Sequence, residues 1–151
     1  MEDGKTVKPA NISVRETWES LEAAVDQGIA KSIGVSNFQG QSLYDLFTYA
    51  KHPVSSLQIE HHPYLTQPGL IKLAQTHDIV VTAYSSFGPQ SFLEIGSDRA
   101  QEIGLLFDAE PVKKAAEKHG KTPAQVLLRW ATQRNIAVIP CLLYTSPSPR
   151  D

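Results

Sequence analysis

The sequence has little of what marks secreted, membrane-spanning or polyanion-binding proteins. Its single cysteine, Cys141, cannot form an internal disulfide, which fits a reducing compartment. No apolar run approaches the roughly 20 residues that cross a bilayer, and no charged-then-apolar leader is present. A formal net charge of -2 provides no basic field for nucleic acid. We therefore expect a cytoplasmic protein with neither a membrane nor a nucleic-acid partner.

The sequence also contains neither a Gly-x-Gly-x-x-Gly motif nor a phosphate-loop lysine motif. What it does have is the composition of a globular protein, with 41% apolar and 20% charged residues among 151. A chain of this length can bury one core of ordinary size.

Helices and strands alternate along the chain. Ser13 and Glu16 have the spacing of a capping box, and the helix that follows places Val14, Trp18, Leu21 and Val25 on one face. Further helices are predicted over 40–51, where Pro53 ends the helix, and over 68–76. Strands are predicted over 31–35, 55–60 and 79–84. The last is nearly unbroken apolar sequence, typical of a parallel strand covered on both faces.

A long connection over about 85–107 separates this part from two more helices. The first of them could be capped by Asp108 and ends near Gly120, and the second starts with Thr122 as N-cap and Pro123. A fourth strand is predicted over 136–139. Alternation of this kind predicts an α/β fold with a parallel sheet, and four strands are half of an eight-stranded barrel.

Polar residues follow three of the predicted strands. Ser36 and Asn37 follow the first, His61 and His62 the second, and Ser85 the third. Ligands of α/β proteins bind at the carboxyl ends of strands, so we expect these ends to form one wall of a small-molecule site.

Residues 141–151 break the pattern. Instead of a turn into another helix, the chain continues in Ser- and Pro-rich sequence without periodicity. The string resembles an in-frame translation of a sequencing adaptor, and the alternative is a natural disordered tail. We interpret 1–140 as native and 141–151 as a non-native tail.

Five motifs in order resemble the C-terminal half of the aldo-keto reductase family, most closely its fungal-type D-xylose (aldose) reductases. They are GVSNF at 34–38, LQIEHHPY at 57–64, TAYSSFGPQSF at 82–92, KTPAQVLLRW at 121–130 and IAVIP at 136–140. The resemblance implies a (β/α)8 TIM barrel, of which this chain would supply roughly strands 5–8. It further implies NADPH as cofactor, with tolerance of NADH beside it, and an aldehyde or sugar substrate such as D-xylose, reduced to an alditol. The parent protein would be a monomer or a homodimer.

The resemblance also implies roles for individual residues. Ser36, Asn37 and Gln58 match residues that hold the nicotinamide carboxamide, and Tyr84 matches the ring that stacks on the nicotinamide. Glu94 matches an acidic residue at the adenosine ribose. The residues implied to contact the cofactor are Ser36, Asn37, Gln58, Tyr84, Ser85, Ser86, Phe87, Gln90, Ser91, Glu94 and Phe107.

Two departures from the family pattern matter. Cys141–Leu143 stands where the family has a Lys-Ser-Asn motif for the 2′-phosphate. The family's catalytic Tyr, Lys, His and Asp lie upstream of Met1, so no residue here is assigned a catalytic role, and we expect this chain alone to be inactive. No metal site is expected, because His61 and His62 point to opposite sides of an extended chain.

Simpler interpretations remain beside these. Ser36 and Asn37 could cap the next helix, Tyr84 could be a core or rim residue, and Glu94 could be a solvated charge. A buried Gln58 would need partners in any interpretation. The protein could also be a non-catalytic NADPH-binding relative of the regulatory-subunit type, or a short protein with an open four-stranded sheet.

Overall fold

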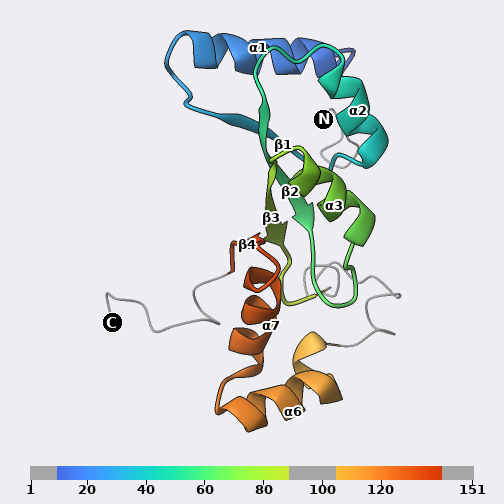
Figure 1. The fold of residues 1–151 in the computed structure, drawn as a ribbon, viewed down its shortest axis with the longest axis vertical. Coiled ribbons are helices and arrows are strands. Elements are labelled where there is room, and N and C mark those ends of the chain that lie inside the picture. Colours follow the sequence, from blue (N-terminus) through green and yellow to red (C-terminus); the bar gives the residue numbers. More distant parts are fainter. Residues whose placement is uncertain (1–9, 89–104, 141–151) are drawn as a thin grey trace, which may run out of the picture.

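The computed structural model describes residues 10–88 and 105–140. Its centre is a four-stranded parallel sheet in the order β1-β2-β3-β4 (Figure 1). The strands are β1 Ile33–Ser36, β2 Val54–Glu60, β3 Val80–Tyr84 and β4 Ala137–Val138. The helices are α1 Val14–Asp26, α2 Gly40–Phe47, α3 Pro68–Thr76, η1 Leu106–Asp108, α6 Glu110–His119 and α7 Pro123–Thr132. The predicted alternation and parallel sheet are confirmed.

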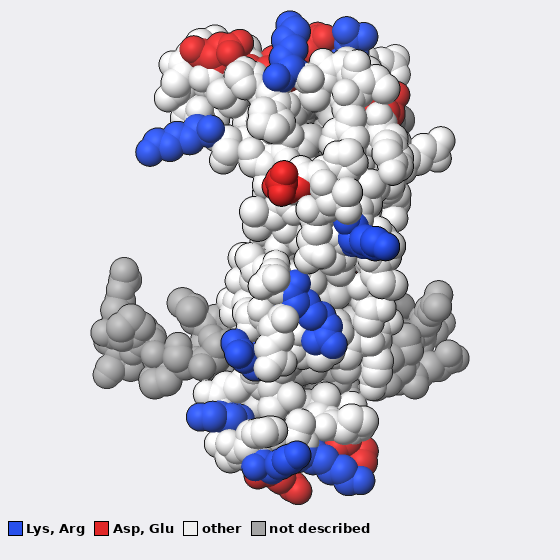
Figure 2. All heavy atoms as spheres, in the orientation of Figure 1, with Lys and Arg blue, Asp and Glu red and all other residues white. Residues whose placement is uncertain are grey.

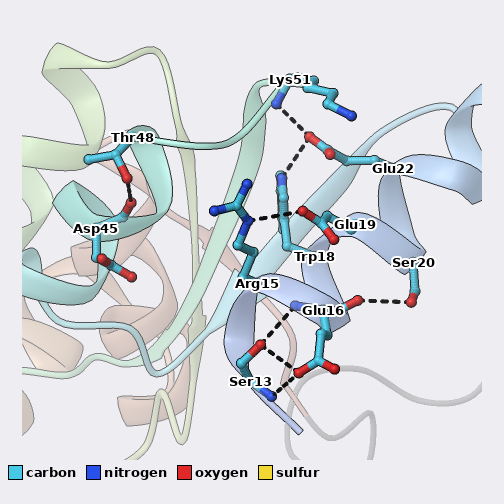
Figure 3. Close-up of polar contacts among 10 residues, drawn as sticks. All are labelled: Ser13, Arg15, Glu16, Trp18, Glu19, Ser20, Glu22, Asp45, Thr48 and Lys51. Carbon is cyan, nitrogen blue, oxygen red and sulfur yellow. Dashed lines mark hydrogen bonds and ion pairs between the residues drawn. The ribbon is translucent and has the colours of Figure 1, made fainter.

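Two of the predicted N-caps form, at Ser13 and at Thr122. The Ser13 hydroxyl accepts from the Glu16 amide at 3.1 Å, and the Glu16 carboxylate accepts from the Ser13 amide at 2.8 Å (Figure 3). Thr122 and Gln125 make the same reciprocal pair at the start of α7. Each pair satisfies backbone N–H groups that a helix start leaves without intrahelical partners.

Three predicted boundaries were wrong. Helix α2 ends at Phe47 rather than near residue 51, because the chain leaves the helix at Thr48, its C-cap, before it reaches Pro53. Asp108 belongs to η1 and does not cap α6; the N-cap is Ala109, and Asp108 instead pairs with Lys113 at 3.0 Å. Strand β4 is shorter than predicted, because β3 pairs with only two of its residues.

The main core lies between one face of the sheet and the helices. Alternate strand residues are buried in it, such as Leu57, Ile59 and Val81, together with Trp18 of α1 and Leu46 of α2. The opposite face is more open. Val80 is 57% exposed there, so the prediction that its strand is covered on both faces was wrong for the part of the chain described.

The face of α1 predicted to be buried is only half covered. Trp18 is buried and Val25 packs partly against the core, but Val14 and Leu21 are 49% and 38% exposed. Ile12, Val14 and Leu21 instead line an open groove beside Phe38. Their spacing is that of a buried helix face, but all three remain exposed in the described part of the chain.

A buried carboxylate joins α1 to the chain before β2. Glu22 Oε1 accepts hydrogen bonds from Trp18 Nε1 at 2.9 Å and from the backbone amides of Lys51 at 2.6 Å and His52 at 2.9 Å. Figure 3 shows Trp18 and Lys51 converging on this oxygen. His52 also contacts Asp26, with 2.8 Å between Nε2 and Oδ1. Because buried charge is costly unless it is hydrogen-bonded, these donors account for a carboxylate that is only 4% exposed.

Charged side chains of both signs are visible on one face of the molecule (Figure 2). On the face drawn in Figure 2, acidic and basic groups occur together at both ends of the molecule. In the described part of the chain, no helix is long and apolar enough to cross a membrane. The tail at 141–151, including Cys141, lies outside the described residues.

Candidate active-site wall at the strand ends

The carboxyl ends of β1, β2 and β3 lie side by side in register. Ser36 is level with Gln58, and Gln58 is level with Thr82. Two residues further on, Glu60 is level with Tyr84. Because side chains alternate along a strand, these polar residues share the face of the sheet that the helices do not cover.

Hydrogen bonds connect these ends. The Ser36 hydroxyl donates to the Gln58 carbonyl oxygen at 3.1 Å, and the Asn37 backbone amide donates to the same oxygen at 2.9 Å. The Tyr84 hydroxyl donates to Asn37 Oδ1 at 2.8 Å. Ser36, Asn37, Gln58 and Tyr84 are therefore close together; we call this group the strand-end cluster.

Two residues that follow these strands have left-handed backbone conformations. Asn37 has φ of 59° and Ser85 has φ of 48°. Asparagine adopts this conformation more readily than most residues, whereas serine does so less often. Backbone conformations of this kind cluster at functional sites.

The Gln58 side chain differs from the sequence-based expectation. It is exposed rather than buried and makes no hydrogen bond to another described residue. The reason is that its strand has only one face covered, and Gln58 lies on the other. Its amide is thus available to a ligand, with one acceptor and two donors.

Ser86 and Phe87 lie in a more buried environment than the strand-end cluster. Ser86 is 6% exposed and its hydroxyl donates to the Ala83 carbonyl oxygen at 3.4 Å. Phe87 packs in a second apolar cluster with Leu106, and its ring lies 5.2 Å from that of Phe107. The structure therefore brings Phe87 and Phe107 together. Ser85 and Ser86 link Phe87 to Tyr84 along the chain. Gln90, Ser91 and Glu94 lie outside the described residues.

His61 and His62, which follow β2, have different surroundings. His62 Nε2 lies 3.1 Å from Glu60 Oε1. His61 instead stacks on Trp130 of α7, with ring centroids 4.9 Å apart, so the expectation that it belongs to the wall formed by the strand ends was wrong. His61 lies two residues after Ile59 and four after Leu57, and this spacing predicts that its ring faces the helices as theirs do.

Thr82 was not among the residues predicted for the site. It lies level with Gln58 in the neighbouring strand, and the alternation of β3 places it on the same face as Tyr84. That alternation was visible in the sequence, although the register was not. Across residues 10–88 and 105–140, no three His, Cys, Asp or Glu side chains are placed to hold a metal ion together.

Comparisons with known proteins give matches over almost the whole chain. The model of the aldo/keto reductase family matches residues 3–146. The chain is 58% identical over 135 residues to a probable NAD(P)H-dependent D-xylose reductase of Aspergillus terreus, covering 89% of this chain and 42% of the relative. It is 59% identical over 128 residues to the NAD(P)H-dependent D-xylose reductase of Hypocrea jecorina, covering 85% and 40%.

A solved structure, the aldose reductase from Schistosoma japonicum, matches with a TM-score of 0.73 at 33% identity. The match covers 87% of this chain and 38% of that protein. The chain thus spans about two fifths of the length of the relatives it matches. The family model matches almost the whole sequence, and the parallel strands agree with the fold of the solved relative. The chain therefore belongs to the aldo/keto reductase family, and its four-stranded sheet is part of that family's (β/α)8 barrel.

Proposed function

We propose that this chain is the C-terminal part of an NAD(P)H-dependent aldose reductase that reduces a sugar such as D-xylose to its alditol. In this proposal residues 1–140 belong to the barrel and 141–151 are a non-native tail. Support comes from the family membership and from two relatives whose names state this activity. The observation that carries the proposal is the strand-end cluster, in which Tyr84 is hydrogen-bonded to Asn37 and Ser36 to Gln58.

The cluster has the donors and acceptors that a nicotinamide carboxamide requires. A carboxamide presents one acceptor and two donors, and the Ser36, Asn37 and Gln58 side chains offer both kinds of group. We propose that these three residues hold the carboxamide and that Tyr84 lies against the ring. Bound NAD(P)H would supply the hydride. Fixing the carboxamide decides which ring face is presented, and orientation of this kind contributes to rate.

The remaining predicted cofactor contacts are proposed on the family resemblance. Ser85, Ser86 and Phe87 would belong to the segment that folds over the pyrophosphate, and Phe107 would lie near the adenine. Gln90, Ser91 and Glu94 are proposed to lie along the pyrophosphate and the adenosine ribose. A carboxylate accepts hydrogen bonds from ribose hydroxyls and repels a 2′-phosphate, which favours use of NADH beside NADPH.

No residue of this chain is proposed as the proton donor. The resemblance places the catalytic Tyr, Lys, His and Asp before Met1, so we expect the 151-residue chain alone to show no aldehyde-dependent NADPH oxidation. We further propose that the full-length protein acts in the cytoplasm, as a monomer or a homodimer. Genomic sequence across Pro140 tests the proposed tail, and a Lys-Ser-Asn continuation is expected.

The function is tested on the full-length protein by D-xylose-dependent loss of NADPH absorbance. Gln58→Leu is expected to raise KM for NADPH about five- to tenfold, the cost of roughly one lost polar contact. Gln27→Leu removes an exposed amide at the end of α1 and should leave KM unchanged. Absence of D-xylose reduction, or the same KM in both variants, would contradict the proposal.

A further inference from the structure

Glu60 places a carboxylate on the uncovered face of the sheet, beside the strand-end cluster. It is the last residue of β2 and lies level with Tyr84 of β3. Two positions earlier, Gln58 and Thr82 form the preceding pair of the same two strands. Because alternate residues of a strand share a face, the Glu60 side chain projects beside that of Tyr84. It is only 17% exposed there.

Hydrogen bonds hold the end of β2 in place. The Gln67 side chain donates from Nε2 to the Glu60 carbonyl oxygen at 2.7 Å. The next backbone amide, that of His61, donates to the Tyr84 carbonyl oxygen at 3.3 Å. The backbone of Glu60 is therefore tied both to the loop that follows and to the neighbouring strand, so the position of its side chain is set by the fold.

One oxygen of the Glu60 carboxylate is held and the other is free. Oε1 lies 3.1 Å from Nε2 of His62, a residue that is 4% exposed. Oε2 makes no hydrogen bond or ion pair with a described residue, and no described lysine or arginine pairs with this carboxylate. Unlike His62 Nδ1, which is buried without a partner, Oε2 remains accessible. His62 thus orients a carboxylate that still has an acceptor to offer.

Tyr84 connects this carboxylate to the proposed cofactor wall. Its hydroxyl reaches Asn37 on the far side of β2, so its side chain crosses the end of β2, where Gln58 and Glu60 project. In the proposed function Tyr84 lies against the nicotinamide and Gln58 holds the carboxamide. Glu60 neighbours both of these residues, and it therefore brings a negative charge to the proposed position of the ring.

A negative charge at this place distinguishes the two forms of the cofactor. The nicotinamide ring of NADPH is neutral, whereas that of NADP⁺ carries a positive charge. A fixed carboxylate attracts the charged ring and has no comparable attraction for the neutral one. Charges that are already in place where charge develops also assist the reaction, since they need no reorganisation.

We propose that the Glu60 carboxylate, oriented by His62, stabilises the positive charge of the oxidised nicotinamide. Glu60 makes no contact with the cofactor phosphates in this proposal, so it favours NADP⁺ over NADPH through the ring alone. The inference rests on the proposed cofactor site, but not on the identity of the sugar substrate.

The test measures the Kd of NADP⁺ and of NADPH for the full-length protein by isothermal titration calorimetry. Both forms carry the same phosphates, so the ratio of the two constants isolates the charge of the ring. We expect Glu60→Gln to raise the Kd for NADP⁺ about three- to tenfold and that for NADPH by less than about twofold, the effect of one partly screened charge. Glu60→Asp keeps the charge and should retain most of the preference.

A purely structural role of Glu60 predicts a different result. Glu60→Gln would then weaken both forms equally, or lower only the midpoint of urea unfolding, and either result overturns the proposal. Glu117→Gln removes an exposed carboxylate of α6 and should change neither constant. Should Glu60→Gln fail to fold, Glu60→Ser removes the same charge with a smaller side chain and makes the same comparison.

The outcome separates this inference from the proposed reductase activity. An unchanged ratio of the two constants, with D-xylose reduction observed, overturns the role of Glu60 alone. A changed ratio without D-xylose reduction supports the role of Glu60 and contradicts the proposed substrate. Failure of the full-length protein to bind either form overturns both proposals.

Discussion

The Tyr84 hydroxyl donates to Asn37 Oδ1 at 2.8 Å, although the strands that carry these residues are not neighbours. Strand β2 lies between β1 and β3, so the bond spans the carboxyl end of the intervening strand. The backbone carbonyl oxygen of Gln58 in that strand accepts hydrogen bonds from the Ser36 hydroxyl and from the Asn37 backbone amide. These hydrogen bonds hold three strand ends in one arrangement in the absence of a ligand, which reduces the conformational entropy lost on binding.

Removing the Tyr84 hydroxyl should weaken cofactor binding without unfolding the protein. In full-length protein, Tyr84→Phe is expected to raise the Kd for NADPH about two- to tenfold, since one neutral hydrogen bond contributes about 0.5–1.5 kcal/mol. Quenching of protein fluorescence by NADPH measures this. Tyr44→Phe, at a ring 58% exposed on α2, is the matched control. An unchanged Kd in Tyr84→Phe would show that the hydrogen bond from the Tyr84 hydroxyl to Asn37 does not contribute to cofactor binding.

Gly34 is required by close packing between β1 and β2. A Cβ at this position would collide with the side chain and the backbone carbonyl of Ser56. Gly34→Ala should therefore destabilise the fold by about 1–3 kcal/mol, as overpacking usually does. Gly69→Ala, where a Cβ meets nothing within 4 Å, should be neutral or slightly stabilising. Urea unfolding compares the two, and equal midpoints would show that the strands can separate at no cost.

Glu22 is expected to matter more than other carboxylates of α1, because one oxygen accepts from Trp18, Lys51 and His52. Glu22→Gln should lower the free energy of unfolding by about 1–3 kcal/mol, the cost of weakening charge-assisted bonds to buried donors. Glu19→Gln changes a side chain that is 48% exposed and paired with Arg15, and should cost less than about 1 kcal/mol. Urea unfolding followed by far-UV circular dichroism compares the two variants.

The same carboxylate predicts a pH dependence. Burial opposes ionisation of Glu22, but the amides of His52 and Lys51 and the Trp18 indole together lower its pKa below the ordinary value of 4.5. A group whose pKa is lower in the folded state stabilises that state above the unfolded pKa. This stabilisation is lost as the pH falls from about 4.5 through the folded-state value. We expect the free energy of unfolding to fall less with decreasing pH in Glu22→Gln than in the unchanged protein. If the free energy of unfolding has the same pH dependence in both proteins, the assignment to Glu22 is wrong.

Local features of the fold were predictable from the sequence. The capping boxes at Ser13 and Thr122 involve residues three apart, and left-handed Gly120 ends α6 where it was expected. Such features depend on neighbours in the chain, so spacing alone indicates them. The parallel sheet followed equally from the alternation of elements.

Features that depend on packing partners were not predictable. Val14 has the spacing of a core residue but is 49% exposed, because no described element covers that face. Gln58 is exposed for a similar reason. The bond between Tyr84 and Asn37 spans 47 residues and an intervening strand, so no local pattern indicates it. The sequence predicted that these residues belong to one site, but not the contact that joins them.

The most direct test of the proposed cofactor wall is a crystal structure of the full-length protein with NADP⁺. The carboxamide should lie within hydrogen-bonding distance of the Ser36, Asn37 and Gln58 side chains, with the nicotinamide ring against Tyr84. A cofactor bound with its nicotinamide away from these strand ends would contradict the central claim.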